Sequence, residues 1–582
     1  MFKLLRFMKP RDWLFVVLCA GFVVAQVYCD MTMPEYTERL MTEVVADRMS
    51  MTVVWRNGGF MLLYAFGSAA CSVVCGFFAA QTAANFAKNL RKAMLDRVTS
   101  FSAAEINKFG TSSLITRTTN DVVQMQTFVA IGLQLLIKAP VLAVWAIIKV
   151  SSTAVEWTIA TAVVVGIIVV TVGILVGVCY PKFKRIQKLT DALNTATRES
   201  ITGVRVVRAF NAEAYQSGKF EEVNDKVTAN HLFTARWLGL MMPVMTICLN
   251  GLTLAVYWIG AVLINDAVGM AKVDLFANMT VFTQYAMQVV MAFMLLIMIF
   301  MILPRSLVSG KRINEVLSLH RSVRSGAVKE VKREDGVPVI EFKNVGFAYD
   351  RGDGRVVSDI SFAVNRGETV AFIGATGSGK TTLVNLMERF YDVDEGEVLF
   401  NGVNVKDYDE EVLRANIALA PQRAVLFKGD IKGNVAYGED GVDDERLNSA
   451  LETACAAEFV SGLDEGVNAP VAQDGSNFSG GQKQRISIAR AVYKNAELMI
   501  FDDTFSALDY KTDMLVRGNI KRNLADSTVV IVAQRIGTIM NADKIIVLED
   551  GKIAGMGRHE QLLETCPVYK EIALSQLSKE EL

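Results

Sequence analysis

The fold of the second half of the chain is decided by one stretch, Gly374-Ala375-Thr376-Gly377-Ser378-Gly379-Lys380-Thr381. It follows the apolar run Val370–Ile373 and leads into a helical pattern, which is the strand–loop–helix setting of a phosphate-binding (Walker A) loop. Glycines let the backbone N–H groups turn inward around a phosphate, and the helix N-terminus adds partial positive charge. Lys380 can reach the terminal phosphates, and the Thr381 hydroxyl can ligate Mg²⁺. The stretch therefore predicts a site for ATP and magnesium.

The residues around this loop predict an α/β domain. From Val339 onward, short apolar runs typical of strands alternate with helical patterns, which indicates a largely parallel sheet. The runs are Val339–Phe342, Glu368–Ile373, Leu498–Phe501, Thr528–Val532 and Lys544–Leu548. The run ending at Phe501 is followed by Asp502, which is expected to hold the metal as a Walker B carboxylate.

The first half of the chain has a different character. Hydrophobic residues make up 52% of the sequence, and the long apolar runs all lie before about Leu303. Six runs are long enough to cross a bilayer, which takes roughly 20 residues. They are Trp13–Cys29, Gly58–Ala80, Phe128–Val150, Trp157–Tyr180, Leu238–Ile264 and Met279–Leu303. We therefore expect a multidomain chain: an all-α six-helix transmembrane domain at 1–318, a linker at 319–338 and an α/β P-loop ATPase domain at 339–582.

Positive charge predicts how the spans are oriented. Lys and Arg gather before the first span, after the second and after the fourth. The loops after the first, third and fifth spans carry few Lys or Arg that are not balanced by acidic residues. Because cytoplasmic loops are enriched in these residues, both termini and the ATPase domain are expected in the cytoplasm, with the spans in the plasma (inner) membrane. The segments Ala83–Ser100 and Lys182–Asn230 contain little Pro or Gly, so we expect the helices to continue beyond the membrane. Ordinary surface loops are the alternative.

Composition argues against two other classes of function. The formal net charge is −1, so no global charge points to nucleic acid as a partner. The eight cysteines and three histidines show no spacing typical of a disulfide framework or a metal-ligand cluster.

A second motif, Phe478-Ser479-Gly480-Gly481-Gln482-Lys483-Gln484-Arg485, resembles the signature sequence of ABC transporters. The resemblance covers essentially the whole chain and is to exporters with six helices per half (type IV). It implies that the residues from Ser479 to Gln482 face the γ-phosphate of ATP held by an opposite subunit. The chain is then one half of a dimer, and its ATPase site is complete only with a second half.

The same resemblance assigns the other nucleotide residues. Tyr349 is similar to the aromatic residue that stacks on adenine, Gln422 to the glutamine that senses Mg²⁺, and Asp509 lies in the loop that crosses to the other site. The turns at Asn107–Gly110 and Asn211–Ala214 resemble coupling helices that dock on ATPase domains. The nucleotide contacts expected are Tyr349, Gly374, Thr376, Gly377, Ser378, Gly379, Lys380, Thr381, Thr382, Gln422, Ser479, Gly480, Gly481, Gln482 and Asp509, with Thr381, Gln422 and Asp502 at the metal.

Two residues depart from the family pattern. Asp503 stands where the family has a Glu that acts as general base, and Gln534 replaces the switch histidine. The Asp carboxylate falls roughly 1 Å short of a position set for Glu, and a misplacement of that size can cost about 100-fold in rate. Gln cannot become cationic near neutral pH.

These departures predict an asymmetric pair of the kind known among bacterial multidrug-type exporters. The chain's own site would bind ATP with Asp503 as a weak base, and its signature would complete the competent site of a partner half. A slow homodimer is the alternative, as is an ATP-gated channel or regulator.

The transport path is less strongly marked. The resemblance implies outward movement of a small amphipathic drug, a lipid or a peptide by alternating access, although import is also conceivable. Five methionines share one face of the last span and suit varied apolar ligands, unless they face lipid or pack against helices. They are Met287, Met291, Met294, Met298 and Met301. Lys138 is an intramembrane charge and thus a functional candidate, unless it extends to the interface.

Overall fold

A computed structural model describes residues 2–45, 50–151, 155–268, 270–349, 354–439, 441–524 and 527–577. The chain divides into two compact units. The first comprises Met1–Thr99 and Ser112–Leu319, and the second comprises Ser100–Thr111 and His320–Leu582. The short segment at 100–111 is thus grouped with the C-terminal unit although it lies between helices of the first.

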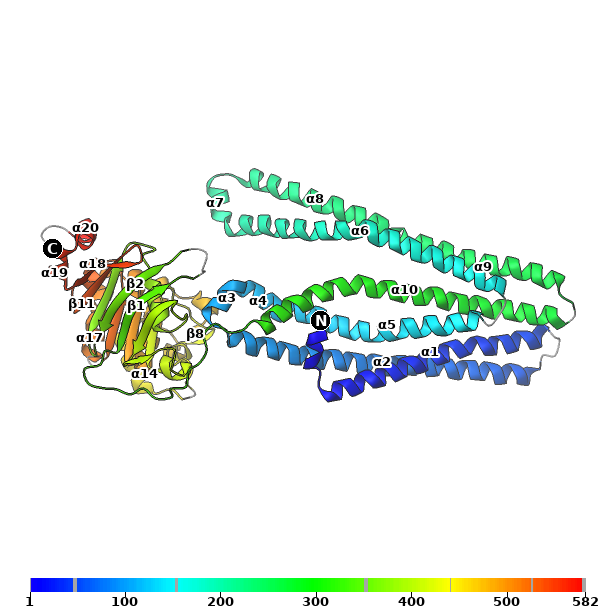
Figure 1. Cartoon of the computed structure of the whole chain (residues 1–582), viewed down its shortest axis with the longest axis horizontal. Helices are drawn as coiled ribbons and strands as arrows, with labels where there is room; N and C mark the ends of the chain where they lie inside the picture. The colour runs from blue at the N-terminus through cyan, green and yellow to red at the C-terminus, as the bar shows by residue number, and fades with distance from the viewer. Residues whose placement is uncertain are drawn as a thin grey trace. The chain divides into compact units, whose positions relative to one another are not determined.

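Helices are the only regular secondary structure among the described residues of the first unit (Figure 1). Its elements are a 3₁₀ helix at Phe2–Phe7, α1 (Pro10–Val45), α2 (Met51–Thr99), α4 (Thr111–Thr118), α5 (Asn120–Ser151), α6 (Val155–Thr202), α7 (Val204–Ala209), α8 (Glu213–Gly239), α9 (Met241–Asp266) and α10 (Met270–Ser318). Six helical segments are long and apolar enough to cross a membrane, which confirms the six predicted spans. The chain is therefore a multi-pass membrane protein.

Several helices run well beyond their apolar stretches. α2 continues to Thr99 and α6 to Thr202, so the polar segments that follow the second and fourth apolar runs are helical, as predicted. α6 and α8 lie side by side and are joined through the short α7 (Figure 1). Of the predicted turn at Asn211–Ala214, Asn211 and Ala212 lie between α7 and α8, whereas Ala214 is already in α8; Asn211 has a φ of 48°.

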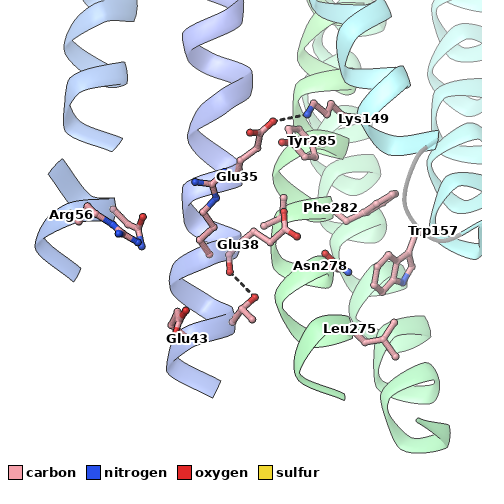
Figure 2. Close-up of a pocket in the computed structure, with 14 residues that line it drawn as sticks. Glu35, Glu38, Glu43, Arg56, Lys149, Trp157, Leu275, Asn278, Phe282 and Tyr285 are labelled. Atoms are coloured by element: carbon pink, nitrogen blue, oxygen red, sulfur yellow. Dashed lines mark hydrogen bonds and ion pairs between the residues drawn. The ribbon is translucent and has the colours of Figure 1, made fainter. Parts of the chain in front are cut away.

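The transmembrane helices are held together by polar contacts as well as by apolar packing. α1 and α5 are linked by two ion pairs, Lys138 with Asp30 at 3.9 Å and Lys149 with Glu35 at 2.5 Å, the second of which is drawn in Figure 2. The hydroxyl of Tyr285 on α10 donates to the carbonyl of Met31 on α1. Because water is scarce inside a bilayer, such groups must find partners within the protein. Lys138, which the sequence marked as an intramembrane charge, has Asp30 as that partner.

The second unit contains two main sheets. Its strands are β1 (Ile340–Phe347), β2 (Val357–Val364), β3 (Thr369–Gly374), β4 (Glu395–Phe400), β5 (Val403–Asn404), β6 (Ile417–Ala420), β7 (Gly429–Asp430), β8 (Pro470–Val471), β9 (Leu498–Asp502), β10 (Thr528–Val532), β11 (Lys544–Glu549) and β12 (Lys552–Gly557). An antiparallel sheet has the order β2-β1-β4-β5, and a six-stranded sheet has the order β12-β11-β3-β10-β9-β6. In the larger sheet every neighbouring pair is parallel except β11 with β12.

The second unit also contains helices. They are α3 (Ala103–Phe109), α11 (Lys380–Met387), α12 (Glu410–Ala415), α13 (Ile431–Val435), α14 (Asp444–Thr453), α15 (Ala457–Ser461), α16 (Gly480–Lys494), α17 (Tyr510–Asn523), α18 (Ile536–Ile539), α19 (His559–Thr565) and α20 (Pro567–Gln576), with 3₁₀ turns at Gly466–Asn468, Gln473–Gly475 and Thr504–Ala507. β9 and β10 are buried along their whole length, which explains their continuous apolar sequences. An α-helical domain followed by an α/β domain is the fold class predicted.

The register of the parallel strands positions the candidate site. β10 pairs with β9 and with β3, so that Val532 lies opposite both Asp502 and Phe372. The carboxyl ends of the three strands therefore meet at one edge of the sheet, where ligands bind in open α/β folds. The loop after β3, the acid at the end of β9 and the residues after β10 all reach this edge.

Candidate nucleotide site

The loop after β3 has a conformation that requires glycine at two positions. Gly374 has a φ of 157°, and a Cβ there would lie 2.1 Å from the carbonyl oxygen of Leu548. Gly379 has a φ of 98°, and its Cβ would lie 2.6 Å from a methyl group of Val357. No other residue type fits both the backbone angles and the space. Thr376 and Gly377 form the exposed tip of the loop, whereas Ser378, Gly379 and Lys380 are buried.

Lys380 is held at the base of this loop. Its Nζ donates to the carbonyl oxygens of Gly374 and Ala375, each at 2.8 Å, and lies 3.4 Å from Oγ of Ser378. Burial lowers the pKa of Lys380, and the nearby carboxylates of Asp503 and Asp502 act in the opposite direction. A buried cation of this kind is suited to an anionic phosphate.

Two of the three residues expected at the metal, Thr381 and Asp502, are in contact with each other. The Thr381 hydroxyl donates to Oδ1 of Asp502 at 3.3 Å, so the hydroxyl and the carboxylate share one location. Burial raises the pKa of Asp502, which is 4% exposed. A hydroxyl oxygen and a carboxylate oxygen are ligands that Mg²⁺ prefers, so these two residues fit the ion. Gln422 contacts a different acid, Asp503.

Asp503 is the point at which three separate segments converge. Its Oδ2 accepts a hydrogen bond from Nε2 of Gln422 at 3.1 Å and another from Nε2 of Gln534 at 2.9 Å. Its backbone N–H donates to the carbonyl of Val532 on β10. The residue is 8% exposed and has a φ of 47°, a left-handed conformation that Asp tolerates. The two departures from the family pattern, Asp503 and Gln534, are therefore in direct contact.

Tyr349 lies beside α11. Its ring is half exposed and meets the ring of Tyr391 edge-on at 5.1 Å. Its hydroxyl is within hydrogen-bond distance of Oγ1 of Thr382, at 3.1 Å, and accepts from Nδ2 of Asn385. These contacts hold the ring in place and leave part of it free to stack on a base. Tyr391 and Asn385 were missed by the sequence analysis, because neither belongs to a motif of fixed spacing.

Tyr391 also contacts α3. Its hydroxyl accepts a hydrogen bond from Nδ2 of Asn107 at 2.9 Å, and Glu105 accepts from the backbone N–H of Ser322 at 3.0 Å. The predicted turn at Asn107–Gly110 is thus the end of α3 and belongs to the same unit as the P-loop.

The signature residues form a second, separate group. Ser479 caps α16: its Oγ accepts from the backbone N–H of Gln482, whose Oε1 accepts from the backbone N–H of Ser479. Gly480 and Gly481 form the first turn, and nothing lies within 4 Å of a Cβ built on Gly480. Asp509 caps α17 through Thr512, and these hydrogen bonds lower its pKa. Within the described part of the chain no hydrogen bond joins either cap to the P-loop.

Comparisons with known proteins agree with this arrangement. The family model described as "ABC transporter transmembrane region" matches residues 16–293, and the model described as "ABC transporter" matches residues 357–506. The chain is 36% identical over 547 residues to an uncharacterised ABC transporter ATP-binding protein of Mycobacterium tuberculosis, covering 94% of this chain and 93% of the relative. It is 30% identical over 582 residues to an uncharacterised ABC transporter ATP-binding protein of Bacillus subtilis, covering 99% of each.

Two further similarities concern an exporter and a flippase. An ATP-dependent lipid A-core flippase of Saccharophagus degradans is 34% identical over 394 residues, which covers 68% of this chain and 65% of the flippase. The solved structure of a bacterial Atm1-family ABC exporter with ATP bound superposes with a TM-score of 0.81 and 23% identity, covering 99% of each chain. The similarity to the exporter structure shows that the two chains share a fold.

Proposed function

The chain belongs to the ABC transporter family and is an ATP-hydrolysing transporter of the exporter type, and from this premise we propose that it is the catalytically weak half of a two-chain exporter. Its own P-loop, with Asp502 and Thr381 at Mg²⁺, binds ATP but hydrolyses it slowly. Its signature residues, Ser479 to Gln482, complete the faster site of a partner half that carries Glu and His at the positions of Asp503 and Gln534.

The observation that carries this proposal is the pair of amides on Asp503. A general base must hold a carboxylate oxygen within hydrogen-bond reach of the attacking water, and the groups that contact the carboxylate decide where its oxygens point. Here Oδ2 of Asp503 already accepts from both Gln422 and Gln534. A carboxylate that is shorter than Glu and engaged by two donors is a poor base at this position, although Lys380 and the loop remain able to bind phosphate.

The intact signature supports the second part of the proposal. Ser479 and Gly480 are exposed at the start of α16, where the backbone N–H groups suit an anion. No described hydrogen bond joins them to the chain's own P-loop, which supports a phosphate held by another chain. We propose that this other chain is a half-transporter of different sequence. A slow homodimer of two identical chains is the alternative.

The substrate and the membrane are also proposals. A relative named as a lipid A-core flippase supports a lipid-like amphipathic substrate, with drugs and peptides as other candidates. The distribution of Lys and Arg supports a cytoplasmic ATPase unit and the plasma (inner) membrane. Met287, Met291 and Met298 are exposed on α10, which is compatible with a path for apolar ligands, while the side chain of Met301 lies outside the described side chains.

The test is the order of effects of two variants in the assembled pair. With the partner present, Asp503→Ala should lower ATP turnover only slightly, because this site contributes little. Ser479→Ala or Gly480→Asp should be far more damaging, since these residues complete the partner's site. The chain purified alone should show very low ATPase activity. A robust rate from the lone chain that Asp503→Ala abolishes would show that Asp503 is an effective base and that the chain is a homodimer.

A further inference from the structure

The short loop after β10, which we call the switch loop, consists of Ala533, Gln534 and Arg535 and brings Gln534 to Asp503. It begins at the carboxyl end of β10 and ends where α18 begins. At its start, the backbone N–H of Ala533 donates to the carbonyl of Phe372 on β3 at 3.1 Å. This bond fixes the first residue of the loop. The position of Gln534 therefore also depends on how the other end is held.

The other end of the switch loop is held by Gln576, the last residue of α20. Its Nε2 donates to the carbonyl oxygen of Gln534 at 2.8 Å, and its Oε1 accepts from the backbone N–H of Ile536, also at 2.8 Å. The N–H of Ile536 lies in the first turn of α18, where a helix leaves its N–H groups without partners of its own. One side-chain amide thus uses both of its polar ends on the peptide groups that flank Arg535.

α20 is packed firmly enough to act as an anchor. Tyr569 and Ala573 on α20 are fully buried, as is Ile536 on α18, and all three belong to one apolar cluster. The hydroxyl of Tyr569 lies 2.7 Å from Nδ1 of His559 on α19. α18 and α20 are in contact with each other (Figure 1). Gln576 therefore extends from a fixed helix, and its two hydrogen bonds hold the switch loop in one place.

The place of the switch loop matters because of what Gln534 contacts. Its Nε2 donates to Oδ2 of Asp503 at 2.9 Å, and the carboxylate of Asp503 is close enough to Lys380 to act on its pKa. A terminal phosphate bound by Lys380 therefore lies near the negative charge of Asp503, which the amide of Gln534 partly compensates. A loop displacement of about 1 Å would lengthen this hydrogen bond beyond its effective range.

We propose that Gln576 is a positioning residue of the nucleotide site, which keeps the amide of Gln534 against Asp503 through the switch loop. It acts through Gln534 and not by contact with ATP. When it is removed, the charge of Asp503 is less compensated and repels the terminal phosphate of ATP. ADP lacks that phosphate and is unaffected. The inference goes beyond the asymmetric pair, because these contacts lie within one chain and are the same whether the second half is identical or different.

The experiment compares the affinities of the purified full chain for AMP-PNP, a non-hydrolysable ATP analogue, and for ADP, each with Mg²⁺. Gln576→Ala should weaken AMP-PNP about fivefold, the value of one hydrogen bond, and leave ADP unchanged. Gln576→Glu should weaken AMP-PNP at least as much, because a carboxylate accepts from Ile536 but cannot donate to the carbonyl of Gln534. Hydrogen–deuterium exchange of the peptide that contains Ile536 should become faster in Gln576→Ala.

Two controls show whether the effect passes through the switch loop. Glu571→Ala truncates an exposed side chain on the same helix and should change neither the affinities nor the exchange. In a Gln534→Ala background, Gln576→Ala should weaken AMP-PNP no further, because the amide that it positions is gone.

Three results would overturn the proposal. The first is an unchanged AMP-PNP affinity in Gln576→Ala, and the second is an equal loss for ADP, which would show that Gln576 only stabilises the unit. The third is an additive effect of the Gln534 and Gln576 variants. None of these measurements requires hydrolysis, so a failure of the weak-half proposal would appear in the ATPase rates and not here.

Discussion

Gln534 donates a hydrogen bond of 2.9 Å from Nε2 to Oδ2 of Asp503. The contact joins the residue after β10 to the residue after β9, and Gln422 donates to the same oxygen. An imidazole at the position of Gln534 could carry a positive charge, whereas an amide cannot. The pair therefore orients the carboxylate without providing a cation for the developing negative charge on phosphate.

Restoring both family residues should raise hydrolysis. In Asp503→Glu combined with Gln534→His, the longer carboxylate extends past the amide of Gln422 toward the attacking water, and an imidazole takes the place of the second amide. The ATPase rate of the chain alone should rise by up to about 100-fold, the cost expected of a misplacement near 1 Å. Phosphate release measured on the purified chain checks this. Adding Ser479→Ala should remove the gain, and an unchanged rate in the double variant would show that these residues do not limit turnover.

ATP binding should depend on Lys380. Its Nζ lies at the base of the P-loop, and a charge-assisted hydrogen bond to phosphate is lost in Lys380→Ala. Photo-labelling with an ATP analogue should need about 10- to 100-fold more nucleotide. Lys428→Ala, at an exposed position of the same unit, serves as the control. Equal labelling of both variants would refute the assignment of the site.

The ion pair between Lys138 and Asp30 should contribute to stability. Lys138→Met leaves Asp30 with the hydroxyl of Ser68 but without a cation. We expect a lower thermal midpoint for Lys138→Met and partial recovery when Asp30→Asn is added, because the unpaired charge is then gone. A double-mutant cycle should give a coupling of about 1 kcal/mol, typical of polar contacts between transmembrane helices. Additive effects would show that the pair makes no contribution.

Glu388 should make the ATPase unit less stable at alkaline pH. Burial raises its pKa to about 7, against the opposing effect of Lys494 and Arg414. Because the folded-state pKa exceeds the unfolded one, the folded chain binds the proton more tightly. Its free energy of unfolding therefore falls as pH rises through the interval between the two values. Glu388→Gln should increase the free energy of unfolding of this unit by up to about 3 kcal/mol at about pH 8 and by much less at about pH 5. The thermal midpoint should rise accordingly. A benefit equal at both values would contradict this.

Local patterns were enough to predict much of the fold. The P-loop, the strand ending at Asp502 and the six apolar spans each lie within a short stretch whose chemistry is complete in itself. The helical continuation of α2 to Thr99 also follows from local composition. The sequence did not indicate that Tyr391 contacts both Tyr349 and Asn107, because these residues lie far apart along the chain.

By itself, the sequence determined that this chain spans a membrane, carries a P-loop ATPase domain and departs from its family at Asp503 and Gln534. These properties depend on residue type and short-range spacing, which tertiary structure does not alter. Only the tertiary structure decided that Gln422 and Gln534 share one oxygen of Asp503, and that Lys138 pairs with Asp30. Such contacts join segments that meet through strand register or helix packing, and the short length of a hydrogen bond requires positions that no linear pattern specifies.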